Sequence, residues 1–362
     1  GLFQLESTGM RESIKQMKPN KFDDIIALVA LYRPGPMSNI PIYNDCKNGL
    51  RKPEYIHPSL EPILKSTYGI IIYQEQVMQI AQILAGFTAG EADILRRAMG
   101  KKKKAELDRQ KERFINGAIK NGIAKDVANF VFTKIEPFAQ YGFNKSHAAA
   151  YALIAYQTAY LKTYHKEDFI AATMSTELTN TSKLREFVEE LKRLKVEIIN
   201  PSINKCFPEF KAIDGKIYYG LGAIKNVGLE AISNIIKERE KNGNFKSFED
   251  FVNRVSSKDV NKLQLEGLTK AGVFDEFKHD RNKIFVSIPK AIQHIKNIND
   301  DKINKQTNLF ELDEGKNNNF EFLHSIPWSQ KELLAEEFKS IGFYISSHPL
   351  NEYENIFSQL NI

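Results

Sequence analysis

The sequence has 362 residues, of which 42% are hydrophobic and 27% are charged. This balance is typical of a soluble globular protein and excludes both a largely disordered chain and a membrane protein. The length exceeds what one hydrophobic core usually organises, so we expect two or three domains. The formal charge of +6 is mild, and it fits a polyanionic partner if the excess is local.

The cysteine content and the chain ends bear on where the protein works. Cys46 and Cys206 are the only cysteines, which excludes a disulfide framework and fits a reducing cytoplasm. No apolar run approaches the roughly 18 residues that a bilayer span needs, so we expect a cytoplasmic protein with no membrane partner. The sequence starts at Gly1 without an initiator Met, and we therefore expect a segment of a longer protein.

A buried helix is predicted over residues 23–31, where the sequence is almost continuously apolar. The Pro-Gly-Pro segment at 34–36 ends this helix, because proline cannot continue it and glycine allows a tight turn. Arg33 is therefore held on a stiff turn.

Two more helices are predicted between residue 74 and about residue 100. Residues 74–84 repeat apolar positions at helical spacing. Thr88 and Glu91 then form a capping-box signature, which begins a helix that carries the adjacent arginines Arg96 and Arg97.

Six cations cluster here, because Lys101 to Lys104 follow the two arginines. Arginine offers planar bidentate donors for phosphate, whereas consecutive lysines add unspecific charge along a polyanion. For Lys101 to Lys104 alone, a solvated helix face is the favoured interpretation, but beside the two arginines Lys101 and Lys102 are predicted DNA-binding residues. Arg96 and Arg97 instead predict a phosphate contact. An apolar stripe occupies part of the same helix and leaves little surface on which both arginines could lie without a binding role.

A long, mostly buried helix is predicted after Gly142, with Ser146 as its N-cap. Tyr141, Lys145, Ser146 and His147 place a ring, a cation, a hydroxyl and an imidazole within seven residues, and a nucleotide could use all of them. Taken alone, these residues favour a helix cap and a core histidine over a ligand site.

The composition changes near Pro201, where we expect a second domain to begin. A β-hairpin is predicted over 210–219, turning on an Asp-Gly pair. Residues 297–320 are rich in Asn, Asp and Lys and predict an exposed linker. A helical pattern resumes at Trp328.

Helix-hairpin-helix spacing follows the β-hairpin, from residue 221 to residue 239. A tight turn closed by a glycine lets the next helix begin with free backbone N–H groups, which can bind a DNA phosphate without contacting bases. A weaker copy lies at 263–275. An ordinary helical hairpin is the alternative. The predicted DNA-binding residues of the two turns are Lys225, Asn226, Val227, Gly228, Lys270, Ala271 and Gly272.

The linker contains a short peptide motif of the form Gln-x-x-Leu-Phe at Gln306, Leu309 and Phe310. Exposed leucine and phenylalanine in a polar linker predict docking into a hydrophobic pocket of a partner. The sequence offers no Asp-x-Asp pair of the kind that bridges two catalytic metal ions, and no phosphate-binding glycine loop or nucleophile elbow. These patterns therefore predict nucleic-acid and nucleotide binding without a visible catalytic centre.

Several long blocks of the sequence resemble bacterial replicative DNA polymerases of the C family, the DNA polymerase III alpha subunits. The blocks lie at 1–10, 33–36, 68–78, 95–102 and 141–151. The resemblance covers nearly the whole chain, with the blocks in the order found in the family. It implies a mainly α fold: a multi-helix fingers domain followed by a tandem helix-hairpin-helix domain with a small β-hairpin.

The domain boundaries implied by the resemblance divide the chain into four parts. Residues 1–200 would form the fingers, with a short piece bordering the palm at the start, and 201–296 the tandem helix-hairpin-helix domain. Residues 297–320 would form a linker that carries the internal sliding-clamp-binding peptide. Residues 321–362 would form a helical segment leading to an OB fold outside this sequence.

The resemblance also implies roles for individual residues. Arg96 and Arg97 would lie near the incoming triphosphate, and Tyr141, Lys145, Ser146 and His147 would form the nucleotide-contacting edge, with His147 sensing the sugar. Weaker implications, of closeness to the active-site cleft only, concern Gln4, Ser7, Arg33 and Gln74.

The parent enzyme would polymerise DNA, whereas this segment alone would not, because the palm with its catalytic aspartates and two Mg²⁺ ions lies outside it. The implied partners are primer-template DNA, deoxynucleoside triphosphates, the sliding clamp and other replicase holoenzyme subunits. Two alternatives stay open: a non-enzymatic DNA-binding and clamp-interacting adaptor, and an error-prone relative, which the peptide at Gln306 to Phe310 disfavours.

Overall fold

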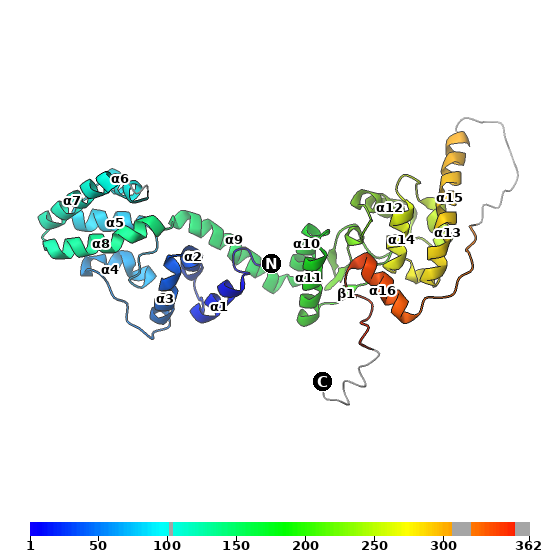
Figure 1. Cartoon of the computed structure of the whole chain (residues 1–362), viewed down its shortest axis with the longest axis horizontal. Helices are drawn as coiled ribbons and strands as arrows, with labels where there is room; N and C mark the ends of the chain where they lie inside the picture. The colour runs from blue at the N-terminus through cyan, green and yellow to red at the C-terminus, as the bar shows by residue number, and fades with distance from the viewer. Residues whose placement is uncertain (101–103, 306–319, 352–362) are drawn as a thin grey trace, which may run out of the picture. The chain divides into compact units, whose positions relative to one another are not determined.

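The structure of the protein is a computed structural model that describes residues 1–100, 104–305 and 320–351. For residues 100, 104, 137–141 and 301–305 it describes the backbone alone. The described chain is mainly helical with one small sheet, as predicted (Figure 1). It divides into two compact units, Gly1–Leu161 (unit 1) and Lys162–Ile362 (unit 2). The predicted boundary between fingers and hairpin domain, near residue 200, stays a prediction.

In the described residues, unit 1 consists of helices and one isolated β-bridge. The helices are α1 (Thr8–Met17), α2 (Phe22–Leu31), α3 (Ile40–Lys47), α4 (Glu61–Leu64), α5 (Gln74–Ala85), α6 (Ala89–Gly100), α7 (Lys104–Lys120), α8 (Lys125–Tyr141) and α9 (Lys145–Tyr164), with short 3-10 turns at 36–39, 58–60 and 65–67. The predicted helices over 23–31 and 74–84 are confirmed. The capping box is confirmed as well, because Thr88 N donates to Glu91 Oε2 at 2.7 Å and Glu91 N donates to Thr88 Oγ1 at 3.3 Å.

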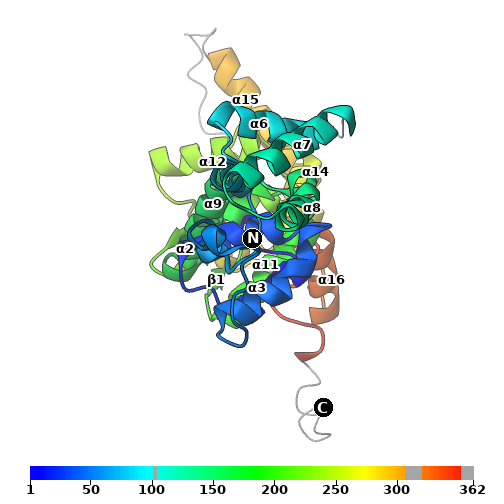
Figure 2. The same cartoon turned by 90° about the vertical axis from the view of Figure 1, so that its left-hand side faces the viewer.

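Two hydrophobic cores organise unit 1. Its helices are drawn in Figure 1 and, turned by 90°, in Figure 2. One lies among α4 to α8, where Leu95, Phe114 and Phe132 are fully buried. The other joins α1, α2 and α3 to α9, around Leu28 and Tyr43. The two cores therefore fix two different groups of helices, and each group contributes residues to the site described below.

A buried acid fixes the start of α2. Asp24 is fully buried and accepts hydrogen bonds from the backbone N–H groups of Asn20 and Lys21 at 3.1 and 3.3 Å. The Tyr43 hydroxyl donates to it at 3.2 Å, and Lys47 Nζ lies 3.2 Å away. A buried carboxylate is tolerated only when it is paired and hydrogen-bonded, so this network locks α2, and with it the turn that carries Arg33.

Helix α9 differs from the expectation of a mostly buried helix. Ala148, Ala152 and Ala155 are fully buried, but Leu153 and Tyr156 are each 48% exposed. The reason is that only one side of the helix, the side lined by small residues, packs against the core of α1 to α3.

Unit 2 combines helices with a three-stranded sheet. Its elements are α10 (Lys166–Thr176), α11 (Thr181–Leu194), β1 (Ile198–Ile199), β2 (Lys211–Ile213), β3 (Lys216–Tyr218), α12 (Leu229–Asn242), α13 (Phe248–Arg254), α14 (Lys262–Lys270), α15 (Arg281–Lys305) and α16 (Gln330–Ile341), with 3-10 turns at 221–223 and 275–277. The strand order is β1-β3-β2, with β1 parallel and β2 antiparallel to β3.

The predicted β-hairpin is confirmed as the β2–β3 pair. Asp214 and Gly215 both have positive φ, at 50° and 74°, as a tight two-residue turn of this kind requires. An aromatic cluster that includes Phe248, Phe251 and Phe274 fills the core of unit 2. None of the described helices is long and apolar enough to cross a membrane.

Candidate nucleotide and nucleic-acid sites

A short parallel bridge joins the start of α5 to the start of α9. Phe143 N donates to Ile72 O at 3.1 Å, and Gln74 N donates to Phe143 O at 3.0 Å. The bridge brings together two segments about 70 positions apart, each of which the sequence singled out separately.

An acidic side chain from α5 closes the start of α9. The Glu75 carboxylate accepts from Lys145 N at 3.0 and 3.1 Å and from Asn144 Nδ2 at 2.9 Å. Asn144 Oδ1 in turn accepts from His147 N at 2.8 Å. Asn144 is therefore the N-cap, and the prediction of Ser146 was wrong: Ser146 is the second residue of the helix and is exposed.

Both predicted phosphate-binding arginines pair with one carboxylate. Arg96 Nε and Nη2 donate to Asp93 Oδ1 at 2.9 and 2.7 Å, and Arg97 Nη2 lies 2.6 Å from Asp93 Oδ2. Hydrogen bonding from Arg96 is the main reason that the pKa of Asp93 is lowered. The Arg97 side chain is 65% exposed, so its guanidinium is open to an anion that competes with Asp93.

Gln74 links the arginines to the bridge. Its Oε1 accepts from Arg96 Nη1 at 3.4 Å, while its backbone N–H is fixed by Phe143. The arginine pair on α6 is thereby placed beside the start of α9.

Arg33 and the rings of Phe143, His147 and Tyr151 form the next part of the site. The Arg33 guanidinium carbon lies 4.2 Å from the centre of the Phe143 ring, and its Nε donates to Ala30 O at 3.0 Å. Burial lowers the pKa of Arg33. The centre of the His147 ring lies 5.2 Å from that of Phe143 and 4.4 Å from that of Tyr151.

The remaining predicted residues of unit 1 lie at the edges of this arrangement. Lys145 Nζ lies 5.4 Å from the centre of the Tyr73 ring. Gln4 and Ser7 line a separate pocket of about 420 Å³ beside α1 and α2, and Phe3, which also lines it, contacts Tyr151 with ring centres 5.4 Å apart. The side chain of Tyr141 lies outside the described atoms.

We define the fingers site as the residues joined by these contacts: Gln74, Asp93, Arg96, Arg97, Arg33, Phe143, Lys145, His147 and Tyr151. Sequence reasoning missed Asp93 and Glu75 as partners. The helical spacing of three and four residues from Asp93 to Arg96 and Arg97 could have shown the first, whereas no local signal connects Glu75 to Asn144.

Asp93 of the fingers site and the neighbouring Glu75 are not arranged for metal binding. Asp93 is engaged by two arginines and Glu75 by the start of α9. In the part of the chain that the structure describes, no three His, Cys, Asp or Glu side chains form a group that could hold a metal ion. These residues therefore do not fit the two Mg²⁺ ions that the resemblance implies for the parent enzyme.

The first predicted hairpin turn in unit 2 leads into an uncapped helix. Asn226 adopts a left-handed conformation with φ of 65°, Val227 is buried, and Gly228 is the N-cap of α12 without a side-chain hydrogen bond. Lys225 N donates to Ser340 O in α16 at 2.9 Å. The hydrogen bond to Ser340 O thus holds the turn against α16, while the first N–H groups of α12 receive no side-chain cap.

The second predicted turn is different, because Arg281 covers it: a Cβ at Gly272 would lie 2.2 Å from Arg281 Nη2. Gly272 has φ of 78°, and its N–H donates to Thr269 O at 3.1 Å. Ala271 is 2% exposed, and its N–H donates to Gly267 O at 3.0 Å. The backbone N–H groups of Ala271 and Gly272 are therefore already used within the fold. Lys270 Nζ pairs with Glu336 Oε2 at 3.0 Å.

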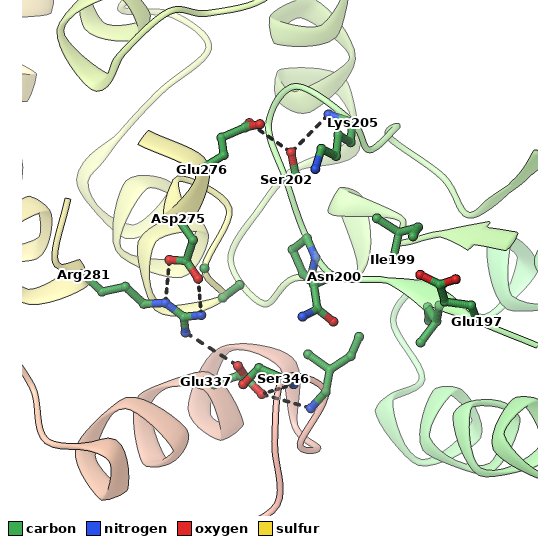
Figure 3. Close-up of a pocket in the computed structure, with 15 residues that line it drawn as sticks. Glu197, Ile199, Asn200, Ser202, Lys205, Asp275, Glu276, Arg281, Glu337 and Ser346 are labelled. Atoms are coloured by element: carbon green, nitrogen blue, oxygen red, sulfur yellow. Dashed lines mark hydrogen bonds and ion pairs between the residues drawn. The ribbon is translucent and has the colours of Figure 1, made fainter. Parts of the chain in front are cut away.

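The covering side chain, Arg281, is the centre of an ion network. Its Nε and Nη2 donate to Asp275 at 2.8 and 2.6 Å, and its Nη1 donates to Lys270 O at 2.9 Å. Glu337 Oε2 lies 3.6 Å from Nη1, and Glu337 Oε1 accepts from the N–H groups of Ile345 and Ser346. The network ties α16 and the segment after it to the second turn, beside a pocket of about 460 Å³ (Figure 3).

Two groups of predicted residues lie outside the described residues. They are the lysines Lys101 and Lys102 and the clamp-peptide residues Gln306, Leu309 and Phe310.

Comparisons with known proteins match both units. Residues 1–122 match the family described as the bacterial DNA polymerase III alpha subunit finger domain, and residues 195–284 match the helix-hairpin-helix motif. The second match covers both predicted turns.

Curated relatives match over the whole length of the chain. The DNA polymerase III subunit alpha of Borreliella burgdorferi is 46% identical over 370 residues, covering 100% of this chain and 32% of the relative. The protein of the same name from Caulobacter vibrioides is 46% identical over 97% of this chain and 31% of its own length, and that from Rickettsia bellii 43% over 100% and 33%. The chain thus spans about a third of the length of these relatives. The chain therefore matches bacterial DNA polymerase III alpha subunits over about a third of their length, and it carries a finger-domain segment followed by a helix-hairpin-helix segment.

Proposed function

We propose that the chain is the nucleotide- and DNA-holding part of a template-directed DNA polymerase, in which unit 1 binds the incoming deoxynucleoside triphosphate and unit 2 holds the DNA duplex. The observation that carries the proposal is the fingers site. Segments around residues 33, 74, 96 and 147 come together there, in a chain whose first 122 residues match the finger domain.

Arg96 and Arg97 are the proposed triphosphate contacts. Asp93 pairs with both guanidinium groups, so an arriving triphosphate takes the place of Asp93 as their anion. Guanidinium groups bind phosphate oxygens in a bidentate manner, and they stabilise the negative charge that builds up on the phosphates during transfer. Asp93 then acts as the counter-ion that keeps the two guanidinium groups ordered before the triphosphate binds.

The rings at the start of α9 are the proposed contact with the nucleoside. His147 lies between Phe143 and Tyr151, and its backbone is fixed by Asn144. An imidazole held in this way can hydrogen-bond to a sugar hydroxyl or ring oxygen with little loss of entropy on binding. Tyr141, Lys145 and Ser146 would complete this edge.

The N-terminus of α12 is the proposed phosphate contact of unit 2. Backbone N–H groups and the helix dipole favour an anion there, and Lys225 adds an exposed cation beside it. Such contacts hold the duplex through its backbone and do not distinguish sequences. Because the amides of the second turn are already used, its contribution would come from Lys270 side-chain charge alone.

The chemistry of bond formation is assigned to the rest of the parent enzyme. The catalytic aspartates and the two Mg²⁺ ions would lie in a palm outside this chain, and the fingers residues bind, orient and neutralise. The peptide at Gln306, Leu309 and Phe310 would hold the enzyme on the sliding clamp, and other holoenzyme subunits would be further partners.

A matched pair of arginine variants in the full-length polypeptide tests the nucleotide site. Arg97→Ala should lower the single-turnover rate of nucleotide incorporation by about 10²-fold, the usual loss when one transition-state donor is removed. Arg109→Ala is the control, because the Arg109 side chain is 74% exposed and pairs with Glu106 on the neighbouring helix α7. Equal rates for the two variants would exclude the assignment of Arg97.

A further inference from the structure

Helix α9 carries no charge along most of its length, yet much of it is exposed. Residues 146–161 contain no Asp, Glu, Lys or Arg. A surface helix normally places charged residues on its outer side, and a helix that is apolar all round is normally buried. The sequence of α9 is thus that of a helix covered on both sides, whereas the structure covers one.

The covered side consists of the fully buried alanines at 148, 152 and 155. Roughly 100° of rotation per residue places Leu153, Ile154 and Leu161 away from this side and Tyr156 on its flank. We define the outer α9 face as Leu153, Ile154, Tyr156 and Leu161, whose residues are 48%, 43%, 48% and 44% exposed. Isolated exposed apolar residues are ordinary, but four within nine positions of one helix form a patch.

A groove extends this face onto α2. It has a volume of about 560 Å³ and is lined by Phe22, Ile25, Leu153 and Tyr156, with polar lining from residues 20 and 21. Phe22 is itself 39% exposed, and its ring meets Tyr156 edge to face at 6.1 Å. The groove therefore has apolar walls from two helices that the buried Asp24 network and the alanine side of α9 hold in place.

We propose that the outer α9 face and its groove are an interdomain surface, and that an apolar face elsewhere in the same full-length polypeptide covers it. The relatives are about three times as long as this chain, which covers 31 to 33% of three of them. A partner within the same polypeptide acts at a high effective concentration, so four large apolar side chains and a groove suffice to hold it. The proposal rests on the proposed function in one respect, that this chain works within a longer polymerase.

Cysteine labelling compares this surface in the 362-residue chain and in the full-length polypeptide. Leu153→Cys should react readily with a maleimide in the 362-residue chain and about tenfold more slowly in the full-length polypeptide, since local opening must then precede reaction. Lys120→Cys, at an exposed position at the end of α7, should react at the same rate in both. Cys46 and Cys206 are buried. The same two proteins without the introduced cysteine therefore give the background labelling rate.

Three results would overturn the proposal. Equal labelling of Leu153→Cys in both proteins means that nothing covers the face. Slow labelling in the 362-residue chain at every concentration means that this chain covers it, and slow labelling only at high concentration means that a second copy does. A Tyr156→Cys variant repeats the test should Leu153→Cys fail to fold.

The same full-length variants also separate this proposal from the proposed function. Primer extension with a face that stays open leaves the function standing and removes the interdomain surface. A face that is protected in a polypeptide that never extends a primer leaves the interdomain surface standing and removes the proposed function.

Discussion

The second turn of unit 2 offers a stability test, because Gly272 and Gly215 share a backbone conformation but differ in surroundings. Both have positive φ, 78° and 74°. A Cβ at Gly272 would lie 2.2 Å from Arg281 Nη2 and 2.8 Å from Asp275 Oδ2, whereas a Cβ at Gly215 would meet nothing within 4 Å. Gly215→Ala therefore measures the backbone cost alone, and Gly272→Ala adds displacement of the arginine.

The expected costs follow from these contacts. A left-handed alanine costs about 1–2 kcal/mol, which is the whole effect at Gly215. Displacing the Arg281 guanidinium also strips the pair from Glu337, which is fully buried, and breaking a buried pair costs about 3–5 kcal/mol. Since Asp275 is half-exposed, we expect the lower part of that range, for a total of about 4 kcal/mol.

Urea denaturation followed by tryptophan fluorescence measures both variants. Trp328 is the single tryptophan and packs against Phe285 in unit 2, with ring centres 5.5 Å apart, so the signal reports on the affected unit. A loss for Gly272→Ala that matches the loss for Gly215→Ala would refute the reasoning that Arg281 covers the turn.

Three further changes test other parts of the account. Lys225→Ala should weaken duplex binding by the full-length polypeptide and lower the slope of log affinity against log salt by about 1, while Lys241→Ala, an exposed lysine at the far end of the same helix, leaves the slope unchanged if the contact is at the N-terminus of α12. The double change Leu309→Ala with Phe310→Ala should leave incorporation on short templates intact and abolish clamp-dependent processivity, and unchanged clamp affinity by surface plasmon resonance would count against the peptide. Asp24→Ala should lower the unfolding free energy of unit 1 by about 3–5 kcal/mol, measured by circular dichroism; a loss under about 1 kcal/mol, typical of an exposed pair, would show that the network is not buried in solution.

Local signals predicted much of the fold. The capping box at Thr88 and Glu91 and the turn at Asp214 and Gly215 were identified from residue types at fixed spacing, because both structures are closed by hydrogen bonds within four residues. Helix α2 was identified from its apolar run.

Local sequence patterns were insufficient where contacts between residues far apart in the sequence determine the local structure. Asn144 and Ser146 are both good N-caps by type, and the choice fell on Asn144, whose side-chain N–H₂ is held by Glu75. Gly272 fits a hairpin turn by sequence, but Arg281 from the next helix lies over it. The uncharged run in α9 predicts burial, and the described residues cover only the alanine side.

The candidate fingers site was predicted mainly through the resemblance to a family. From the residues alone, Lys145, Ser146 and His147 were better explained as a cap and a core histidine. What sequence could not show is that Arg96, Gln74, Arg33 and His147 belong to one place, because the Tyr73–Phe143 bridge that joins them is a tertiary contact.

Primer extension is the most direct test of the central claim, that this chain holds nucleotide and DNA for a polymerase. The full-length gene product should be incubated with Mg²⁺, primer-template DNA and the four deoxynucleoside triphosphates. We predict template-directed extension that Arg97→Ala severely slows. A full-length protein that binds DNA and the clamp but never extends a primer would contradict the account and leave a DNA- and clamp-binding adaptor in its place.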